Sequence, residues 1–178
     1  MKVGFIKAVF ALLILLSPLK VWAVDKLTEE NIREHYQKSI AVVKENNKGK
    51  RLDFINTHYH PDLIVTKKFP IAGKDGTLSE SFETNTTRQQ FIDQLLNAPK
   101  SEISFLEYDI LDIVIRDDAK SALVKDREKV SLCGDNCFSS VVVNECDDEI
   151  ILSPEGIIQL YKATCGWVVP EEFKKKQP

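Results

Sequence analysis

The chain has 178 residues, of which 43% are hydrophobic and 29% are charged, and its formal net charge is −3 at pH 7. This length corresponds to about one domain, which is large enough to bury a core without help from metals. A mildly acidic balance argues against a nucleic-acid partner, because nucleic-acid binding depends on Lys and Arg placed against phosphates.

The first 23 residues have the three parts of a secretory signal peptide. Two lysines precede an unbroken apolar run over residues 8–16, and residues 21–23 (VWA) form a small-x-small cleavage site. The run is shorter than the roughly 20 residues that span a bilayer. We therefore expect residues 1–23 to be removed, leaving a secreted or periplasmic protein of residues 24–178 with no membrane span.

All four cysteines lie in the last third of the chain. An even number of cysteines in an exported protein is typical of two disulfides. A zinc site is the alternative, but the spacing of these cysteines lacks the paired C-x2-C pattern of structural zinc ligands. We expect two disulfides and no cofactor. The cysteines are Cys133, Cys137, Cys146 and Cys165.

The first half of the mature chain is predicted to be mainly helical. Thr28 can cap a helix in which apolar residues recur at helical spacing. A second helix is expected over residues 50–59, followed by a short strand over residues 63–65 and a loop over residues 71–80. The capping box of residues 87–90 opens a third helix. The apolar stripe of the first helix is Ile32, Tyr36, Ile40 and Val43.

The second half is predicted to form four strands separated by turn signals, which is typical of an antiparallel meander. Their ranges are 104–115, 121–132, 138–152 and 157–169. The charge pattern of the first hairpin favours the register that places Glu107 opposite Lys129 and Asp109 opposite Arg127, since opposite charges across strands attract.

The later hairpins predict the disulfides. A turn at residues 134–136 places Cys133 opposite Cys137, and a turn at residues 155–156 places Cys146 opposite Cys165. The hairpin geometry thus predicts the pairs Cys133–Cys137 and Cys146–Cys165, one of the three connectivities that four cysteines allow.

The order of elements over residues 26–169 resembles the nuclear transport factor 2-like (SnoaL-like) superfamily. Residues 53–65 (DFINTHYHPDLIV) and residues 166–169 (GWVV) resemble the superfamily's helix-to-strand turn and the end of its last strand. The resemblance implies an α+β, cystatin-like cone in which three N-terminal helices pack on a curved antiparallel sheet around a pocket. It also implies one domain over residues 24–178, with a loose tail from about residue 170, and homodimers formed through the sheet face.

One face of the predicted sheet is mostly apolar, yet it carries three carboxylates, Asp112, Asp126 and Glu128. Buried carboxylates are costly unless they are paired or line a polar cavity, and burial raises their pKa toward a range useful in proton transfer. Each is a candidate general base, with Tyr108 or Tyr161 stabilising an oxyanion. The alternative is that these carboxylates lie at strand ends and are solvated. The predicted pocket residues are Tyr108, Asp112, Asp126, Glu128, Asn144, Tyr161 and Trp167.

His58 and His60, with Asp62, form the second polar cluster. They could bind a transition metal, but we favour a helix end at which both histidines interact with the helix dipole, so no metal site is predicted.

The leading hypothesis is therefore an exported, non-catalytic module that binds a small molecule or a protein partner in its pocket or on its sheet face. The first alternative is a small isomerase, dehydratase or hydrolase that uses a pocket carboxylate as its general base. The second is a subunit of an envelope or secretion assembly.

Overall fold

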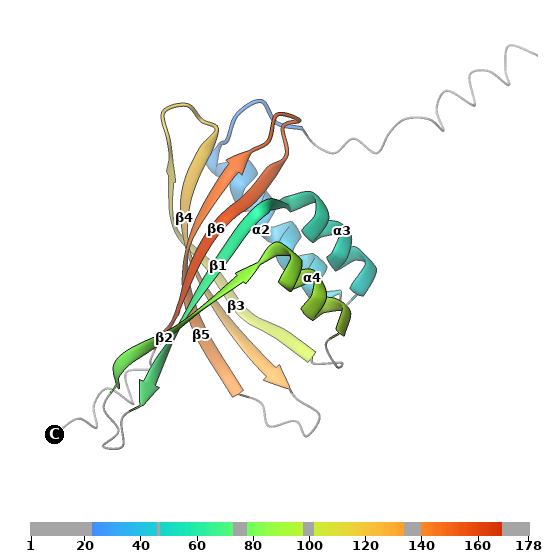
Figure 1. Ribbon diagram of the computed structural model, residues 1–178. Helices are drawn as coiled ribbons and strands as arrows, with labels where there is room; N and C mark the ends of the chain where they lie inside the picture. The colour runs from blue at the N-terminus through green and yellow to red at the C-terminus, as the bar shows by residue number, and fades with distance from the viewer. Residues whose placement is uncertain (1–22, 46, 73–77, 98–101, 134–139, 169–178) are drawn as a thin grey trace, which may run out of the picture.

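The computed structural model describes residues 23–45, 47–72, 78–97, 102–133 and 140–168, and it consists of three helices packed on one side of a six-stranded sheet (Figure 1). The order of the strands across the sheet is β2-β1-β6-β5-β4-β3. No helix in these ranges is long and apolar enough to cross a membrane. The elements are α2 (Glu29–Lys44), α3 (Lys48–His58), β1 (Tyr59–Ala72), β2 (Leu78–Thr87), α4 (Arg88–Asn97), β3 (Glu102–Ile115), β4 (Ser121–Cys133), β5 (Ser140–Leu152) and β6 (Ile158–Trp167).

Side-chain caps define where the helices begin. Thr28 Oγ1 accepts a hydrogen bond from the backbone N–H of Asn31, and the Asn31 side chain accepts one from Thr28. Thr87 and Gln90 make the same reciprocal pair ahead of α4. Both predicted caps are confirmed, because capping depends only on residues three apart in the chain. The second helix begins at Lys48, two residues before the predicted start, with Asn47 as its cap.

The sheet is larger than predicted. β1 spans 14 residues instead of the three expected, and β2 pairs with it in antiparallel fashion. The loop expected over residues 71–80 is therefore wrong at both ends, where Ala72 closes β1 and Leu78 opens β2, while residues 73–77 lie outside the described ranges. β2 is an edge strand whose sequence, LSESFETNTT, is mostly polar, so it lacks the apolar alternation that marks a half-buried strand.

The sheet is also not wholly antiparallel, because β1 pairs with β6 in parallel. This pairing joins the first and last strands of the domain. It brings the end of α3 and the start of β1 against β6 and places α4 over the β1–β2 end of the sheet (Figure 1). Sequence spacing carries no signal for such a distant pairing, so the predicted sheet contained only the meander of β3, β4, β5 and β6.

The register of the meander is confirmed in part. Glu107 lies opposite Lys129 with 2.9 Å between their charged atoms, and Asp109 lies opposite Arg127. Bulges shift the register on both sides of this stretch, between Phe105 and Glu107 and between Ile110 and Asp112.

The next two hairpins differ in outcome. β4 and β5 pair Leu132 with Ser140, two residues beyond the partner that the predicted turn requires, so that register is wrong although both strands keep their faces. The Cys133–Cys137 disulfide lies outside the described residues. Cys146 and Cys165 are opposite each other and bonded, as predicted.

The core lies between the helices and the sheet in two clusters. The larger one joins α2 to the start of β4, the end of β5 and the start of β6, and the smaller one lies where α4 meets β1 and β6. Complete burial of a residue such as Ile32 stabilises the fold by about 1.5–3 kcal/mol. The larger cluster comprises Leu27, Ile32, Tyr36, Ala122, Val124, Ile150, Leu152 and Ile158, and the smaller one Leu63, Val65 and Ala163.

The segment ahead of α2 is attached to two turns of the sheet. Leu27 N donates to the carbonyl of Ala119 in the β3–β4 turn, at 2.8 Å, and Val24 N donates to the carbonyl of Gly156 in the β5–β6 turn, at 2.9 Å. Gly156 has φ +76°, a left-handed conformation that favours glycine. A Cβ at this position would lie 2.8 Å from the Val24 carbonyl oxygen. The glycine is thus required both by the turn and by the segment that packs on it.

Candidate functional site

Two carboxyl side chains are buried side by side on the face of the sheet that the helices cover. They belong to Asp126 on β4, which is 3% exposed, and Asp148 on β5, which is 7% exposed. Asp126 is opposite Cys146 and Asp148 is opposite Val124, so the two aspartates are diagonal neighbours on one face. Asp126 was predicted to lie there, and the structure gives it a carboxyl partner.

Two tyrosines complete this cluster. The Tyr36 hydroxyl, from α2, donates a hydrogen bond of 2.8 Å to Asp148 Oδ2. Tyr108, on β3, stacks on Tyr36 with 5.9 Å between ring centroids. The Tyr108 hydroxyl is close enough to Asp126 for each to affect the pKa of the other, yet it makes no hydrogen bond of normal geometry within the described part of the chain. It is therefore a buried polar group without a proper partner.

Burial and nearby negative charges raise the pKa of both carboxyls. For Asp126 the causes are burial first and then the charges of Asp148 and Glu128, and they raise its pKa to about 8. For Asp148 burial again comes first, and its pKa rises to about 7 although the Tyr36 hydrogen bond lowers it. Because the two carboxyls are neighbours with raised pKa values, their titrations affect each other. Such a pair can accept or donate a proton at neutral pH.

The surrounding tyrosines stay protonated. Burial raises the pKa of Tyr36, Tyr59 and Tyr108, which the nearby carboxylates raise further, and the pKa of Tyr59 reaches about 12. All three hydroxyls are therefore hydrogen-bond donors across the physiological pH range.

A row of predicted residues leads from the carboxyl pair toward the end of the sheet. Glu128 is opposite Tyr108 on one side and Asn144 on the other, and Asn144 Nδ2 donates a hydrogen bond of 2.9 Å to Glu128 Oε1. Asn144 is in turn opposite Trp167, which is 43% exposed. The structure thus brings Tyr108, Asp126, Glu128, Asn144 and Trp167 onto one face, and exposure increases from Asp126 to Trp167.

The structure places two predicted pocket residues elsewhere. The bulge at Leu111 puts Asp112 opposite Lys125 on the other face of the sheet, where it is exposed, so its predicted placement is wrong. Tyr161 is the extra residue of a bulge in β6 and is 39% exposed. Its ring contacts His60 instead of the carboxyl pair, with 5.1 Å between centroids. A bulge inserts one residue and reverses the faces beyond it, which a regular alternation cannot anticipate.

Asp148 and Tyr36 were not among the predicted site residues. Asp148 has the same parity as Asn144 on β5, so alternation from Asn144 already assigns it to the helix-facing side. Tyr36 belongs to the apolar stripe of α2, and its hydroxyl had no identifiable partner in the sequence. The sequence feature that could have identified Asp148 is that alternation along β5 places this acidic residue on the same face of the sheet as Asp126.

The two candidate metal-binding histidines are directed to different neighbours. His58 packs against Phe54 and against His35 of α2, whereas His60 contacts Tyr161. Among the described residues, the ligand atoms of Cys146, Asp148 and Cys165 lie within 4.8 Å of one another. Both of these cysteines are bonded to each other, so this group lacks the thiolates that a metal would need.

Comparison with known proteins identifies the fold. No protein-family model and no curated protein sequence matches the chain. Among solved structures, a ketosteroid isomerase-like protein from Erwinia carotovora atroseptica has a TM-score of 0.54 at 12% identity, over 78% of this chain and 95% of that one. An NTF2-like protein from Cytophaga hutchinsonii has a TM-score of 0.54 at 12% identity, over 80% and 100%. The CaMKII hub of S. rosetta has a TM-score of 0.53 at 10% identity, over 82% and 100%. The chain therefore has the nuclear transport factor 2-like fold, as the order of its elements predicted.

Proposed function

We propose that this protein is an exported module that binds a small, uncharged molecule against the helix-covered face of its sheet. The observation that carries the proposal is the Tyr108 hydroxyl, a buried donor without a proper partner beside the Asp126–Asp148 pair. A buried polar group left unpaired costs about 1–3 kcal/mol, which a ligand acceptor regains on binding. The increase in exposure along Glu128, Asn144 and Trp167 supports entry of the ligand from that end of the face.

The chemistry of the cluster favours a carbonyl-bearing ligand. A carbonyl oxygen can accept from Tyr108 and from the protonated carboxyl of Asp126. An anionic ligand would be repelled by Asp148 and Glu128, whose charges act on Asp126. A cationic ligand would be attracted only weakly, because the carboxyl pair holds a proton near neutral pH and so carries less negative charge.

A thermal-shift screen tests this binding. Small cyclic ketones, the matching carboxylic acids and the matching amines are compared at pH 7. The proposal expects the ketones to raise the melting temperature, and Tyr108→Phe to abolish most of that shift. Tyr161→Phe is the matched control, because this tyrosine is exposed and contacts His60. Ketone shifts that survive in Tyr108→Phe would exclude this site.

Proton transfer is the second candidate function, and the raised pKa values of the neighbouring carboxyls of Asp126 and Asp148 favour it. A carboxyl pair with raised pKa next to a tyrosine donor can remove a proton beside a bound carbonyl while the tyrosine stabilises the oxyanion. The test is exchange of the ketone's α-protons for deuterium in D2O, followed by NMR. Asp126→Asn should stop enzyme-dependent exchange but retain binding. Ketone binding without exchange would reject the proton-transfer function and retain only the binding function.

The outer face of the sheet supports self-association or docking on a partner. Val114 and Leu123 are opposite each other on β3 and β4, and both are exposed, as is Leu111 at the adjacent bulge. The S. rosetta hub similarity is compatible with an oligomer. Light scattering of the purified protein should give a homodimer that Leu123→Lys converts to a monomer. A wild-type monomer across the micromolar range would refute the dimer.

A further inference from the structure

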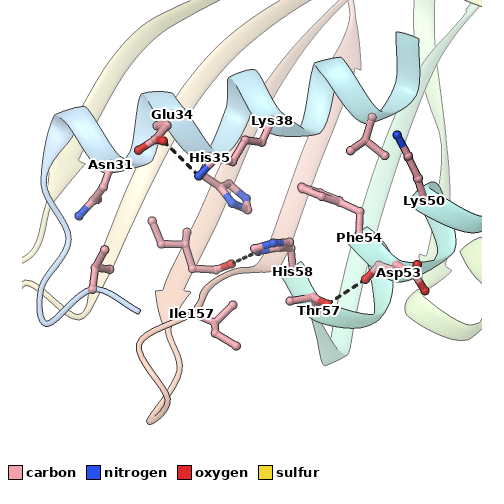
Figure 2. Close-up of a pocket in the computed structure, with 13 residues that line it drawn as sticks. Asn31, Glu34, His35, Lys38, Lys50, Asp53, Phe54, Thr57, His58 and Ile157 are labelled. Atoms are coloured by element: carbon pink, nitrogen blue, oxygen red, sulfur yellow. Dashed lines mark hydrogen bonds and ion pairs between the residues drawn. The ribbon is translucent and has the colours of Figure 1, made fainter. Parts of the chain in front are cut away.

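A cavity lies beside α2 and α3. It has a volume of about 450 Å³ and is bounded by α2, α3 and the residues that lead into β6. Val42, Phe54, Ile157 and Ile158 give it apolar walls, and Figure 2 shows the side chains of Phe54 and Ile157. Neither Asp126 nor Asp148 lines it, and its size is within the range of small-molecule sites.

His58, at the end of α3, presents a hydrogen-bond acceptor to this cavity. Its Nδ1 is 3.0 Å from the carbonyl oxygen of Ile158. A carbonyl only accepts, so Nδ1 carries the proton, and in the neutral ring Nε2 is then an acceptor. Burial lowers the pKa of His58 although the Ile158 bond raises it, so the ring is neutral at pH 7.

His35, on α2, is the second imidazole in the cavity wall. It is 8% exposed and points from α2 toward His58, with 5.1 Å between the ring centroids (Figure 2). Burial first, and then the neighbouring His58 and Lys38, lower its pKa to about 3. The neutral ring has one N–H donor and one acceptor, and no hydrogen bond joins either to another described residue. Its contacts are with the rings of Tyr36, Phe54 and His58.

The charged side chains around the opening are largely neutralised within the protein. Lys38 is paired with Glu34 at 3.1 Å, and Lys50 with Glu45 at 2.7 Å. Asp53 also lines the cavity, so its charged lining consists of two acidic and two basic side chains. The cavity thus has apolar walls, two neutral imidazoles and little net attraction for an ion.

We infer that this cavity binds a small uncharged molecule with an apolar body and one hydroxyl group. The hydroxyl donates to His58 Nε2 and accepts from the ring N–H of His35, so one ligand atom satisfies both imidazoles. The apolar body contacts Phe54 and Val42. This site is separate from the carboxyl cluster and does not depend on the function proposed for it.

Histidine NMR tests the inference directly, because the chain has three histidines and one of them is outside the cavity. The probe is p-cresol, and toluene, which has the same ring without the hydroxyl, is the comparison ligand. The imidazole ¹⁵N resonances of His35 and His58 should shift on titration with p-cresol, whereas those of His60 should not. Tyr108→Phe, which alters the other site, should leave these shifts unchanged.

Substitutions supply the quantitative test. His58→Phe keeps an aromatic ring but removes the acceptor, so p-cresol should bind about 2- to 12-fold more weakly, the effect of one hydrogen bond, while toluene binds no more weakly. His60→Phe is the matched control and should change neither affinity. Val42→Phe fills the cavity from α2 and should block both ligands even if His58→Phe fails to fold. The inference is overturned if toluene matches p-cresol in the wild-type protein, if His58→Phe leaves p-cresol affinity intact, or if the His35 and His58 resonances do not move.

Discussion

Replacing Asp126 by Asn should make the protein more stable at pH 8 and should flatten the dependence of its stability on pH. In the native protein burial and the charges of Asp148 and Glu128 raise the pKa of Asp126 to about 8, so its carboxyl holds a proton at neutral pH. Asparagine has nearly the same size and shape as aspartate, but it cannot ionise. Burial and the charges of Glu128 and Asp147 still raise the pKa of Asp148, so the substitution removes only the contribution of Asp126 to the pH dependence.

The size of the effect follows from linkage between proton binding and folding. The folded-state pKa values, about 8 and about 7, lie above the usual 3.8 of an aspartate, so the folded protein keeps protons that the unfolded chain has lost. The associated stability is complete below the unfolded pKa and is lost as pH rises through the folded values. One such proton changes the free energy of unfolding by about 1.4 kcal/mol per pH unit, or about 2 kcal/mol between pH 6.5 and pH 8.

The pH window matters because His35 acts in the opposite direction. Its folded-state pKa of about 3 is below the usual 6.5, so its contribution rises with pH until the unfolded histidine is neutral. Above pH 6.5 this contribution is nearly constant, and the carboxyl pair dominates. Measurements confined to lower pH would mix the two effects.

Urea unfolding at pH 6.5, 7.2 and 8 provides the assay. The wild-type free energy of unfolding should fall by about 2 kcal/mol across this range, and in Asp126→Asn the fall should be less than half as large. Asp147→Asn is the matched control, since this neighbour of Asp148 is exposed and lies opposite Lys125. Equal slopes for the wild type and Asp126→Asn would refute the raised pKa of Asp126 and, with it, the basis for proton transfer at this site.

Three further outcomes are expected. Intact-mass measurement of the exported protein should give a chain that starts at Val24, and a mass that includes residues 1–23 would show that the segment is retained. Cys165→Ala should lower the free energy of unfolding by about 3 kcal/mol under oxidising conditions, because the Cys146–Cys165 bond closes a long loop with a sequence separation of 19. Cys137→Ala should lower the melting temperature little. A wild-type protein that loses no stability on reduction would contradict the stabilising role of Cys146–Cys165. Gly156→Ala should destabilise by about 1–3 kcal/mol, since alanine there is strained and its Cβ meets Val24, whereas Gly49→Ala in α3 should stabilise slightly; urea midpoints compare the two.

The parts of this fold that could be predicted from the sequence are those set by nearby residues. Thr28 and Thr87 cap their helices through partners three residues away. Cys146 and Cys165 were predicted to meet from the short turn between their strands, but the register next to that turn is one residue off, and the bulge at Tyr161 restores the predicted pairing. The β1–β6 pairing joins segments about 100 residues apart, and the polar edge strand β2 carries little apolar pattern. Neither feature has a local cause, and both were missed.

The candidate site shows how a single residue separates a correct prediction from a wrong one. Alternation placed Asp112 and Asp126 on the same face, and the extra residue at Leu111 moved Asp112 to the outside. The two-residue error in the β4–β5 register did not change which face any residue was assigned to, because an even shift keeps every side chain on its own face. Asp148 therefore stays in phase with Asp126 under either register and takes the place that Asp112 was expected to fill. Alternation along a strand without a bulge thus predicts the members of a buried carboxyl pair more reliably than alternation extended across a possible bulge. The same reasoning explains why Tyr161, at the bulge of β6, is absent from the cluster, whereas Asn144 on the regular strand β5 belongs to it.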